Sequence, residues 1–157
     1  MRLDMEDLFY TYGVDFVLQG HVHAYERTYP VYNNKLNPCG SVYLNLGDGG
    51  NYEGPYASWR QPADVWSAFR EGSFGIGELE IFSESAAKYQ WHRTACGSSN
   101  TSAPVYGMDF SDNCVSPGDN SLHFETVDVV MYTKPLMSEC PNRYYTAPGK
   151  ASKSLRG

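Results

Sequence analysis

The sequence has few basic residues and no long apolar run, and these two absences exclude several classes of protein. Its 157 residues include 12 Lys and Arg against 18 Asp and Glu, which gives a formal net charge of −6. Nucleic-acid-binding domains usually carry a basic patch or stripe, so we expect no nucleic acid as a partner. No apolar stretch approaches the roughly 20 residues that a transmembrane helix needs, so we expect no membrane span.

The sequence also begins without a secretory leader. Met1-Arg2-Leu3-Asp4 continues into further acidic residues, whereas a signal peptide continues into an apolar segment. This beginning taken alone would indicate a cytosolic protein.

The cysteines indicate a different compartment. The chain has four of them, at Cys39, Cys96, Cys114 and Cys140. Their even number and the absence of C-x-x-C spacing disfavour a zinc site and favour disulfides, for which three pairings are possible. Asn100-Thr101-Ser102 is a sequon for N-glycosylation. Disulfides and glycans belong to oxidising compartments, so we expect a secreted or extracellular full-length protein whose leader precedes Met1.

The beginning of the chain predicts a helix and then a buried strand. In residues 4–12, four apolar side chains recur with the spacing of one helical face: Met5, Leu8, Phe9 and Tyr12. Residues 14–18 are apolar except for Asp15, which is typical of a strand covered on both faces. This order of a helix, a tight turn and a buried strand is typical of the last piece of an α/β layer.

The rest of the chain predicts mostly β structure. Strands are expected at 27–32 and 41–46, a glycine-rich turn at 47–51, a short helix at 61–69 that begins at Pro62, a hairpin of 77–82 with 87–92, and one more strand at 126–133. We therefore divide the chain into a folded part at 1–95 and a Ser/Asn/Gly/Pro-rich extension of unknown role at 96–157.

Two histidines, His21 and His23, directly follow the first predicted strand. Ligands of open α/β sheets collect at the carboxyl ends of strands, and imidazole is the commonest metal ligand among side chains. Histidines two apart can present their rings to one ion, or one ring each to two adjacent ions. For an isolated H-x-H pair, the alternative is two ordinary loop histidines that bond to the main chain.

The sequence around the histidines resembles a known family. Gly20-His21-Val22-His23-Ala24-Tyr25-Glu26-Arg27 resembles the last metal-binding motif of the purple acid phosphatases, in the calcineurin-like metallophosphoesterase superfamily. The resemblance continues in order through 37–40, Gly47-Asp48-Gly49-Gly50-Asn51, 70–75 and Trp91-His92-Arg93. It covers about residues 1–93, and the segment from Cys96 onward does not resemble the core of the family.

This resemblance implies the C-terminal part of a calcineurin-like domain, an α+β sandwich flanked by helices. His21 matches the ligand of the divalent metal and His23 a ligand of the ferric ion, in a dinuclear centre of Fe with Zn, Fe or Mn. The implied substrate is a phosphate monoester. The resemblance implies that the other ligands lie upstream of Met1, in a GD motif, a GD-x-x-Y motif and a GNH motif, together with a further histidine before the helix. This chain contains no GNH and no GD-x-x-Y motif. We therefore expect 1–157 alone to be inactive, assign no catalytic residue to it, and leave open whether it pairs with an N-terminal half or with a second copy.

Several roles remain open at this point. Glu26 or Arg27 would orient a histidine, or would form an ion pair that fixes the loop. Asp48 is interpreted as a structural turn residue. His92 is interpreted as a structural residue that binds no metal, and His123 as an ordinary surface histidine. Two further functions stay as alternatives: a non-catalytic truncated or partner-binding product, and a related metallophosphoesterase that acts on diesters or nucleotides.

Overall fold

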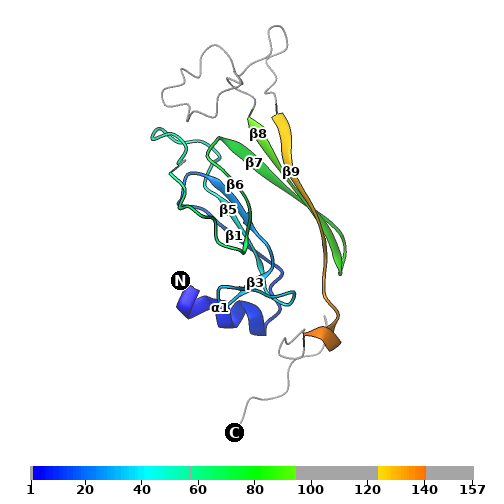
Figure 1. Cartoon of the computed structure of the whole chain (residues 1–157). Coiled ribbons are helices and arrows are strands. Elements are labelled where there is room, and N and C mark those ends of the chain that lie inside the picture. The colour runs from blue at the N-terminus through cyan, green and yellow to red at the C-terminus, as the bar shows by residue number, and fades with distance from the viewer. Residues whose placement is uncertain (1, 57, 95–123, 141–157) are drawn as a thin grey trace.

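The computed structural model describes residues 2–56, 58–94 and 124–140, which form a mixed α/β fold made mostly of strands. The first sheet contains, in spatial order, β1 (Phe16–Gln19), β5 (Val42–Leu46), β2 (Tyr25–Thr28) and β6 (Ser67–Glu71). The second contains β7 (Gly75–Ser83), β8 (Ala86–Thr94) and β9 (Phe124–Thr133). Figure 1 shows these sheets as two layers, with α1 (Arg2–Thr11) at one end of the first.

Three smaller elements complete the described fold. β3 (Val31–Tyr32) and β4 (Lys35–Leu36) form a short hairpin between β2 and β5. A 3-10 turn, η1 (Met137–Glu139), follows β9. Among the described residues, no helix has both the length and the apolar character needed to span a lipid bilayer.

The first sheet is mixed, and its arrangement places the loop between β1 and β2. β1 runs parallel to β5, whereas β2 runs antiparallel to both β5 and β6. Because β5 lies between β1 and β2, the chain that leaves β1 must cross the end of β5 to enter β2. This crossing segment contains the two histidines.

The predicted helix and first strand are present, but their burial differs from the prediction. The helix packs through Phe9, whose ring contacts Tyr43 at a centroid distance of 6.4 Å. Leu8 and Tyr12, from the same apolar face, are 49% and 60% exposed. The prediction that residues 14–18 are covered on both faces is wrong, because Leu18 is 58% exposed.

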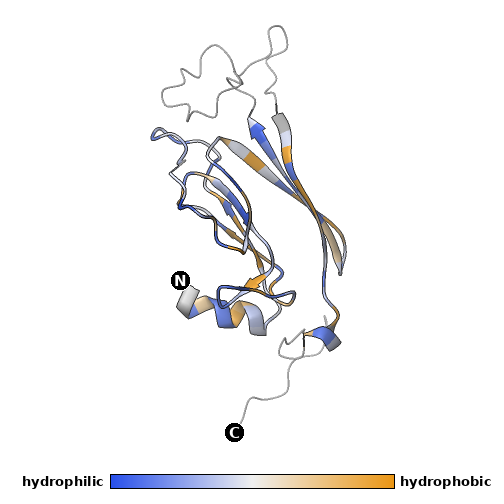
Figure 2. Cartoon of the chain, in the orientation of Figure 1, coloured by the Kyte–Doolittle hydropathy of each residue, from blue (hydrophilic) through white to orange (hydrophobic). Residues whose placement is uncertain are grey.

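The core lies between the two sheets and is dominated by aromatic rings. Tyr25 and Trp91 stack with a centroid distance of 4.6 Å and an interplanar angle of 3°, and Tyr89 lies beside them. The predicted hairpin is confirmed, and in its second strand Ala87, Tyr89 and Trp91 are all buried. Figure 2 shows hydrophobic residues on strands of both layers.

The short helix predicted at 61–69 is wrong. The segment instead contains a cis peptide bond between Gln61 and Pro62, followed by turns, and Ser67 already begins β6. β6 pairs antiparallel with β2, and this pairing with a distant strand outweighs the local helical preference.

Residues 124–140, from the predicted extension, belong to the second sheet and its surroundings. β9 confirms the strand expected at 126–133 and pairs with β8 along its length. Tyr132 on β9 joins the core cluster, and Cys140 forms a disulfide with Cys39, with 5.6 Å between their Cα atoms. Three further predicted features, Cys96, Cys114 and the sequon at Asn100, lie outside the described residues, as does His123.

Candidate metal site

The two histidines lie on the loop that crosses from β1 to β2, at residues 20–24. Both β1 and β5 end at this edge of the sheet, because the two strands are parallel. The sequence thus predicted correctly that the histidines follow the carboxyl end of a strand. His21 is exposed, and the side chain of His23 is 31% exposed, so both rings can be reached by an ion from solvent.

The main chain of the loop is held in an uncommon conformation. His21 has a φ angle of 79°, in the left-handed region that residues other than glycine rarely adopt. Such a conformation persists only where the surrounding structure imposes it, and it is frequent at functional sites. The loop is closed by the amide of Ala24, which donates to the carbonyl of Val22 at 2.8 Å.

His23 has contacts that favour one of its ring nitrogens as a ligand. Its Nδ1 lies 3.4 Å from Oε2 of Glu53, and its carbonyl accepts a hydrogen bond of 2.6 Å from the amide of Tyr56. Histidines that bind metals usually donate their second N–H to a carboxylate or a carbonyl, which fixes the tautomer. Since Glu53 lies beside Nδ1, Nε2 of His23 is the ring nitrogen left available to an ion.

The donor chemistry of the loop fits iron or zinc, but only as part of a site. Imidazole nitrogen is a suitable ligand for both metals. Within residues 2–56, 58–94 and 124–140, however, no group of three or more His, Cys, Asp or Glu side chains is placed to hold an ion. A complete dinuclear centre therefore needs ligands from beyond these residues.

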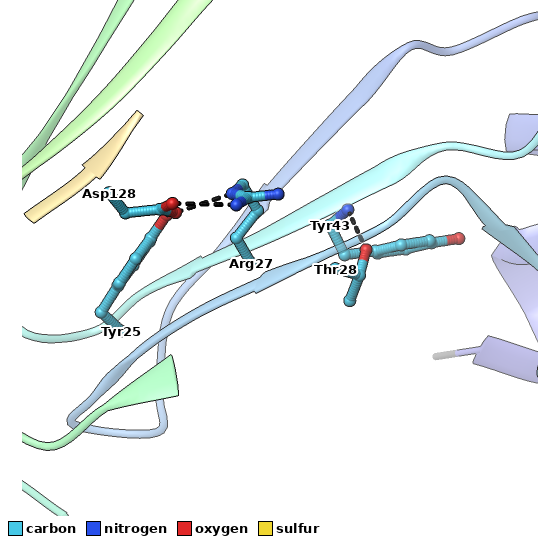
Figure 3. Close-up of polar contacts among 5 residues, drawn as sticks. All are labelled: Tyr25, Arg27, Thr28, Tyr43 and Asp128. Carbon is cyan, nitrogen blue, oxygen red and sulfur yellow. Dashed lines mark hydrogen bonds and ion pairs between the residues drawn. The ribbon is translucent and has the colours of Figure 1, made fainter. Parts of the chain in front are cut away.

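Glu26 and Arg27 contact neighbouring strands. Glu26 accepts a hydrogen bond of 2.6 Å from Ser67 on β6. Arg27 forms a two-pronged ion pair with Asp128 on β9, through Nε at 2.7 Å and Nη2 at 2.8 Å. Tyr25 donates to the same carboxylate at 2.6 Å, so the carboxylate of Asp128 contacts both side chains (Figure 3). These contacts thus fix β2 to β6 in its own sheet and to β9 in the second sheet.

The shared carboxylate remains charged in this environment. Burial alone would raise the pKa of Asp128, but the hydrogen bonds from Arg27 and Tyr25 outweigh it and lower the pKa below its usual range. Burial and the bond to Asp128 raise the pKa of Tyr25, which therefore keeps its proton. A second interaction on β2 lies nearby, where Thr28 accepts a hydrogen bond from the amide of Tyr43 at 2.9 Å (Figure 3).

Asp48 and His92 both have contacts of a structural kind. Asp48 is 1% exposed, and its Oδ2 accepts a hydrogen bond of 2.7 Å from the indole of Trp91. Burial raises the pKa of Asp48 to about 6, against the opposing effect of the Trp91 bond. His92 lies 2.8 Å from the hydroxyl of Thr126, and so connects β8 with β9. Both arrangements agree with the structural roles that the sequence predicted.

Three residues around the site were missed in the sequence: Asn45, Glu53 and Asp128. For Asp128 a signal existed, because a single acid within the apolar run Val127-Asp128-Val129-Val130 requires a buried partner. Asn45 interrupts the apolar strand at 42–46 in the same way. Glu53 has no comparable signal, since it lies in a polar loop.

Comparison with known proteins identifies the class. Residues 40–102 match the family model described as iron/zinc purple acid phosphatase-like protein C. The structure of purple acid phosphatase PPD1 from yellow lupin seeds is similar in fold, with a TM-score of 0.58 and 20% identity, over 94% of this chain and 23% of that one.

Two curated relatives show the similarity in sequence. The chain is 52% identical over 93 residues to purple acid phosphatase 18 of Arabidopsis thaliana, covering 59% of this chain and 21% of the relative. It is 38% identical over 117 residues to Fe(3+)-Zn(2+) purple acid phosphatase 12 of the same plant, covering 68% and 25%. The chain belongs to the purple acid phosphatase family and matches its members over their C-terminal region. It spans about a fifth of the length of the first of these relatives.

Proposed function

We propose that this chain supplies His21 and His23 to a dinuclear centre of Fe with Zn, Fe or Mn that hydrolyses phosphate monoesters. The observation that carries the proposal is the pair of accessible imidazoles on a strained loop at the carboxyl edge of the sheet. The proposal is supported by membership of the family and by one relative whose name specifies Fe(3+) and Zn(2+).

The residues of this chain would act by holding ions in place. His21 would bind the divalent ion, and His23 would bind the ferric ion through Nε2 while Glu53 faces Nδ1. When bound, such a metal pair polarises a phosphoryl oxygen and generates hydroxide from water. Arg27 and Asp128 would keep β2, and with it the end of the loop, fixed against the second sheet.

The same geometry implies that other segments complete the centre. Two imidazoles do not saturate two ions, and no third ligand accompanies them within the described residues. We propose that the remaining ligands come from an N-terminal half, as part of one longer chain or of a partner. The disulfide between Cys39 and Cys140 supports an oxidising compartment and hence a secreted or extracellular protein.

A Zn²⁺ titration of the 157-residue chain tests the metal role directly. The imidazole proton signals of His21 and His23 should shift in NMR spectra, whereas those of His92 should not. His21→Ala should weaken Zn²⁺ binding, since it removes the ligand proposed for the divalent ion. Unchanged signals for both loop histidines would contradict the proposal.

Activity measurements test the need for further ligands. With Fe and Zn added, 1–157 alone should hydrolyse an aryl phosphate hardly above the free metals. Robust turnover that is lost in His21→Ala would show that the chain completes its own centre. A substrate panel on a protein that includes the N-terminal half would separate monoesters from diesters and nucleotides.

A second candidate function is non-catalytic binding of a partner. It is favoured by the apolar surface of α1 and β1, where Leu8, Tyr12 and Leu18 are 49%, 60% and 58% exposed. Cooperative unfolding of a soluble chain that binds no Zn²⁺ would support this function in place of the first.

A further inference from the structure

We propose that Asn45 is a positioning residue that sets the conformation of the histidine loop for metal binding. This inference rests on the proposed function of His21 and His23. Asn45 lies near the carboxyl end of β5, in register with Gln19 on β1 and Glu26 on β2. It therefore lies in the strand that the loop crosses, between the two strands that the loop connects.

The side chain of Asn45 bonds to the loop on both sides of His23. Its amide nitrogen donates to the carbonyl of Val22 at 2.9 Å and to the carbonyl of Ala24 at 2.5 Å. Both partners are acceptors, so only the NH₂ group, with its two donors, can occupy this position. Two fixed carbonyls on either side of His23 determine the direction in which its imidazole leaves the loop.

The main chain that follows Asn45 supports the loop from the same side. A Cβ atom built on Gly47 would lie 2.0 Å from the carbonyl oxygen of Val22. Any other residue at this position would collide with the loop, so the loop lies directly on the turn after β5. These contacts surround the segment in which His21 adopts its φ of 79°.

Asn45 is buried, so its amide does not serve as a polar group that faces water. The residue is 6% exposed on a strand whose neighbours Val42 and Leu44 are core residues. An apolar side chain would suit this environment, but it would leave the carbonyls of Val22 and Ala24 without this donor. The amide is therefore matched to the loop, and the loop contains the two proposed ligands.

Ser41 provides a matched control at the other end of β5. It is 2% exposed, and its hydroxyl donates to the carbonyl of Val14, just before β1, at 2.6 Å. Ser41→Ala thus removes a buried hydrogen bond from a side chain to the main chain, of the same kind as the two that Asn45→Ala removes, but at the end of β5 away from the histidines.

The experiment compares Zn²⁺ affinity in the full 157-residue chain for the wild type, Asn45→Ala, Asn45→Thr and Ser41→Ala. Calorimetry gives the affinity, and the NMR signals of the four histidines show where the ion binds. Loss of a residue that orients a ligand typically lowers metal affinity 10- to 100-fold. We expect a loss of about tenfold for Asn45→Ala, a smaller loss for Asn45→Thr, which keeps one donor, and none for Ser41→Ala. If Asn45→Ala does not fold, as judged by circular dichroism, Asn45→Leu replaces it because it preserves the side-chain size.

Each result decides between distinct conclusions. Equal affinity in the wild type and Asn45→Ala would overturn the positioning role while leaving His21 and His23 as ligands. Equal losses in Asn45→Ala and Ser41→Ala would also overturn it, because general destabilisation would then explain both. Wild-type chain that binds no Zn²⁺ through the loop histidines would overturn the proposed function, and the positioning role with it.

Discussion

Replacement of Asp128 by alanine should destabilise the protein more than removal of one partner from an ion pair at its surface. The carboxylate of Asp128 accepts two hydrogen bonds from Arg27 and one from Tyr25. The side chains of Asp128 and Arg27 are only 7% and 11% exposed. Asp128→Ala therefore leaves a guanidinium and a phenol without their partner between the two sheets.

The magnitude follows from burial. Removing one partner from a buried ion pair costs about 3–5 kcal/mol, because the remaining charge stays uncompensated. Small domains have a total free energy of unfolding of roughly 5–15 kcal/mol. Asp128→Ala should thus remove a large share of the stability, whereas Arg27→Met combined with Asp128→Leu should recover most of it, since no charge is then buried.

Urea unfolding, followed by tryptophan fluorescence, to which Trp91 contributes from its stack on Tyr25, measures these changes. Glu80→Ala is the control, because its ion pair with Lys88 lies at the surface, with side chains 49% and 28% exposed. Exposed pairs contribute less than about 1 kcal/mol. If Asp128→Ala and Glu80→Ala shift the unfolding midpoint equally, or if the double variant is no better than Asp128→Ala, the reasoning from burial is refuted.

Two other changes should show how the turn and the disulfide contribute. Because burial raises the pKa of Asp48 from 3.8 to about 6, stability from this residue should be fullest below pH 3.8 and should decline as the pH rises through about 6. Asp48→Asn should make the unfolding midpoint less dependent on pH between pH 4 and pH 7. If the midpoint depends on pH as strongly as in the wild type, the raised pKa of the buried carboxylate is contradicted. Cys39→Ser with Cys140→Ser opens a loop closed across 101 residues and should lower the free energy of unfolding by about 2–5 kcal/mol. A midpoint that dithiothreitol leaves unchanged would contradict this second expectation.

The elements that depend on nearby residues could be predicted from the sequence. The hairpin of β7 and β8 follows from the alternation of apolar and polar residues, which is clearest in β8, where Ala87, Tyr89 and Trp91 are buried. The loop of His21 and His23 follows from an apolar run that ends in glycine. Its role in metal binding stays a prediction, because two ligands alone do not define a centre.

The features that depend on which strands become neighbours could not be predicted. The partner of Arg27 lies on β9, 101 residues further along the chain. The pairing of Cys39 with Cys140 has the same separation, and no local pattern selects it from the three possibilities. The exposure of Leu18 likewise depends on what packs on the face of β1, which is a property of the fold rather than of residues 14–18.

The long separations between these partners have a consequence for biosynthesis. Tyr25 and Arg27 meet Asp128, Asp15 meets Tyr132, and Cys39 meets Cys140, so each contact closes across more than one hundred residues. Contacts between residues this far apart in the chain slow folding, because the entropy of closing the loop is lost before the contact forms. A nascent chain therefore carries its histidine loop long before β9 has been translated. During that interval Arg27 lacks the carboxylate of Asp128 and Cys39 lacks Cys140, which makes this the stage at which we expect chaperones and disulfide isomerases to act.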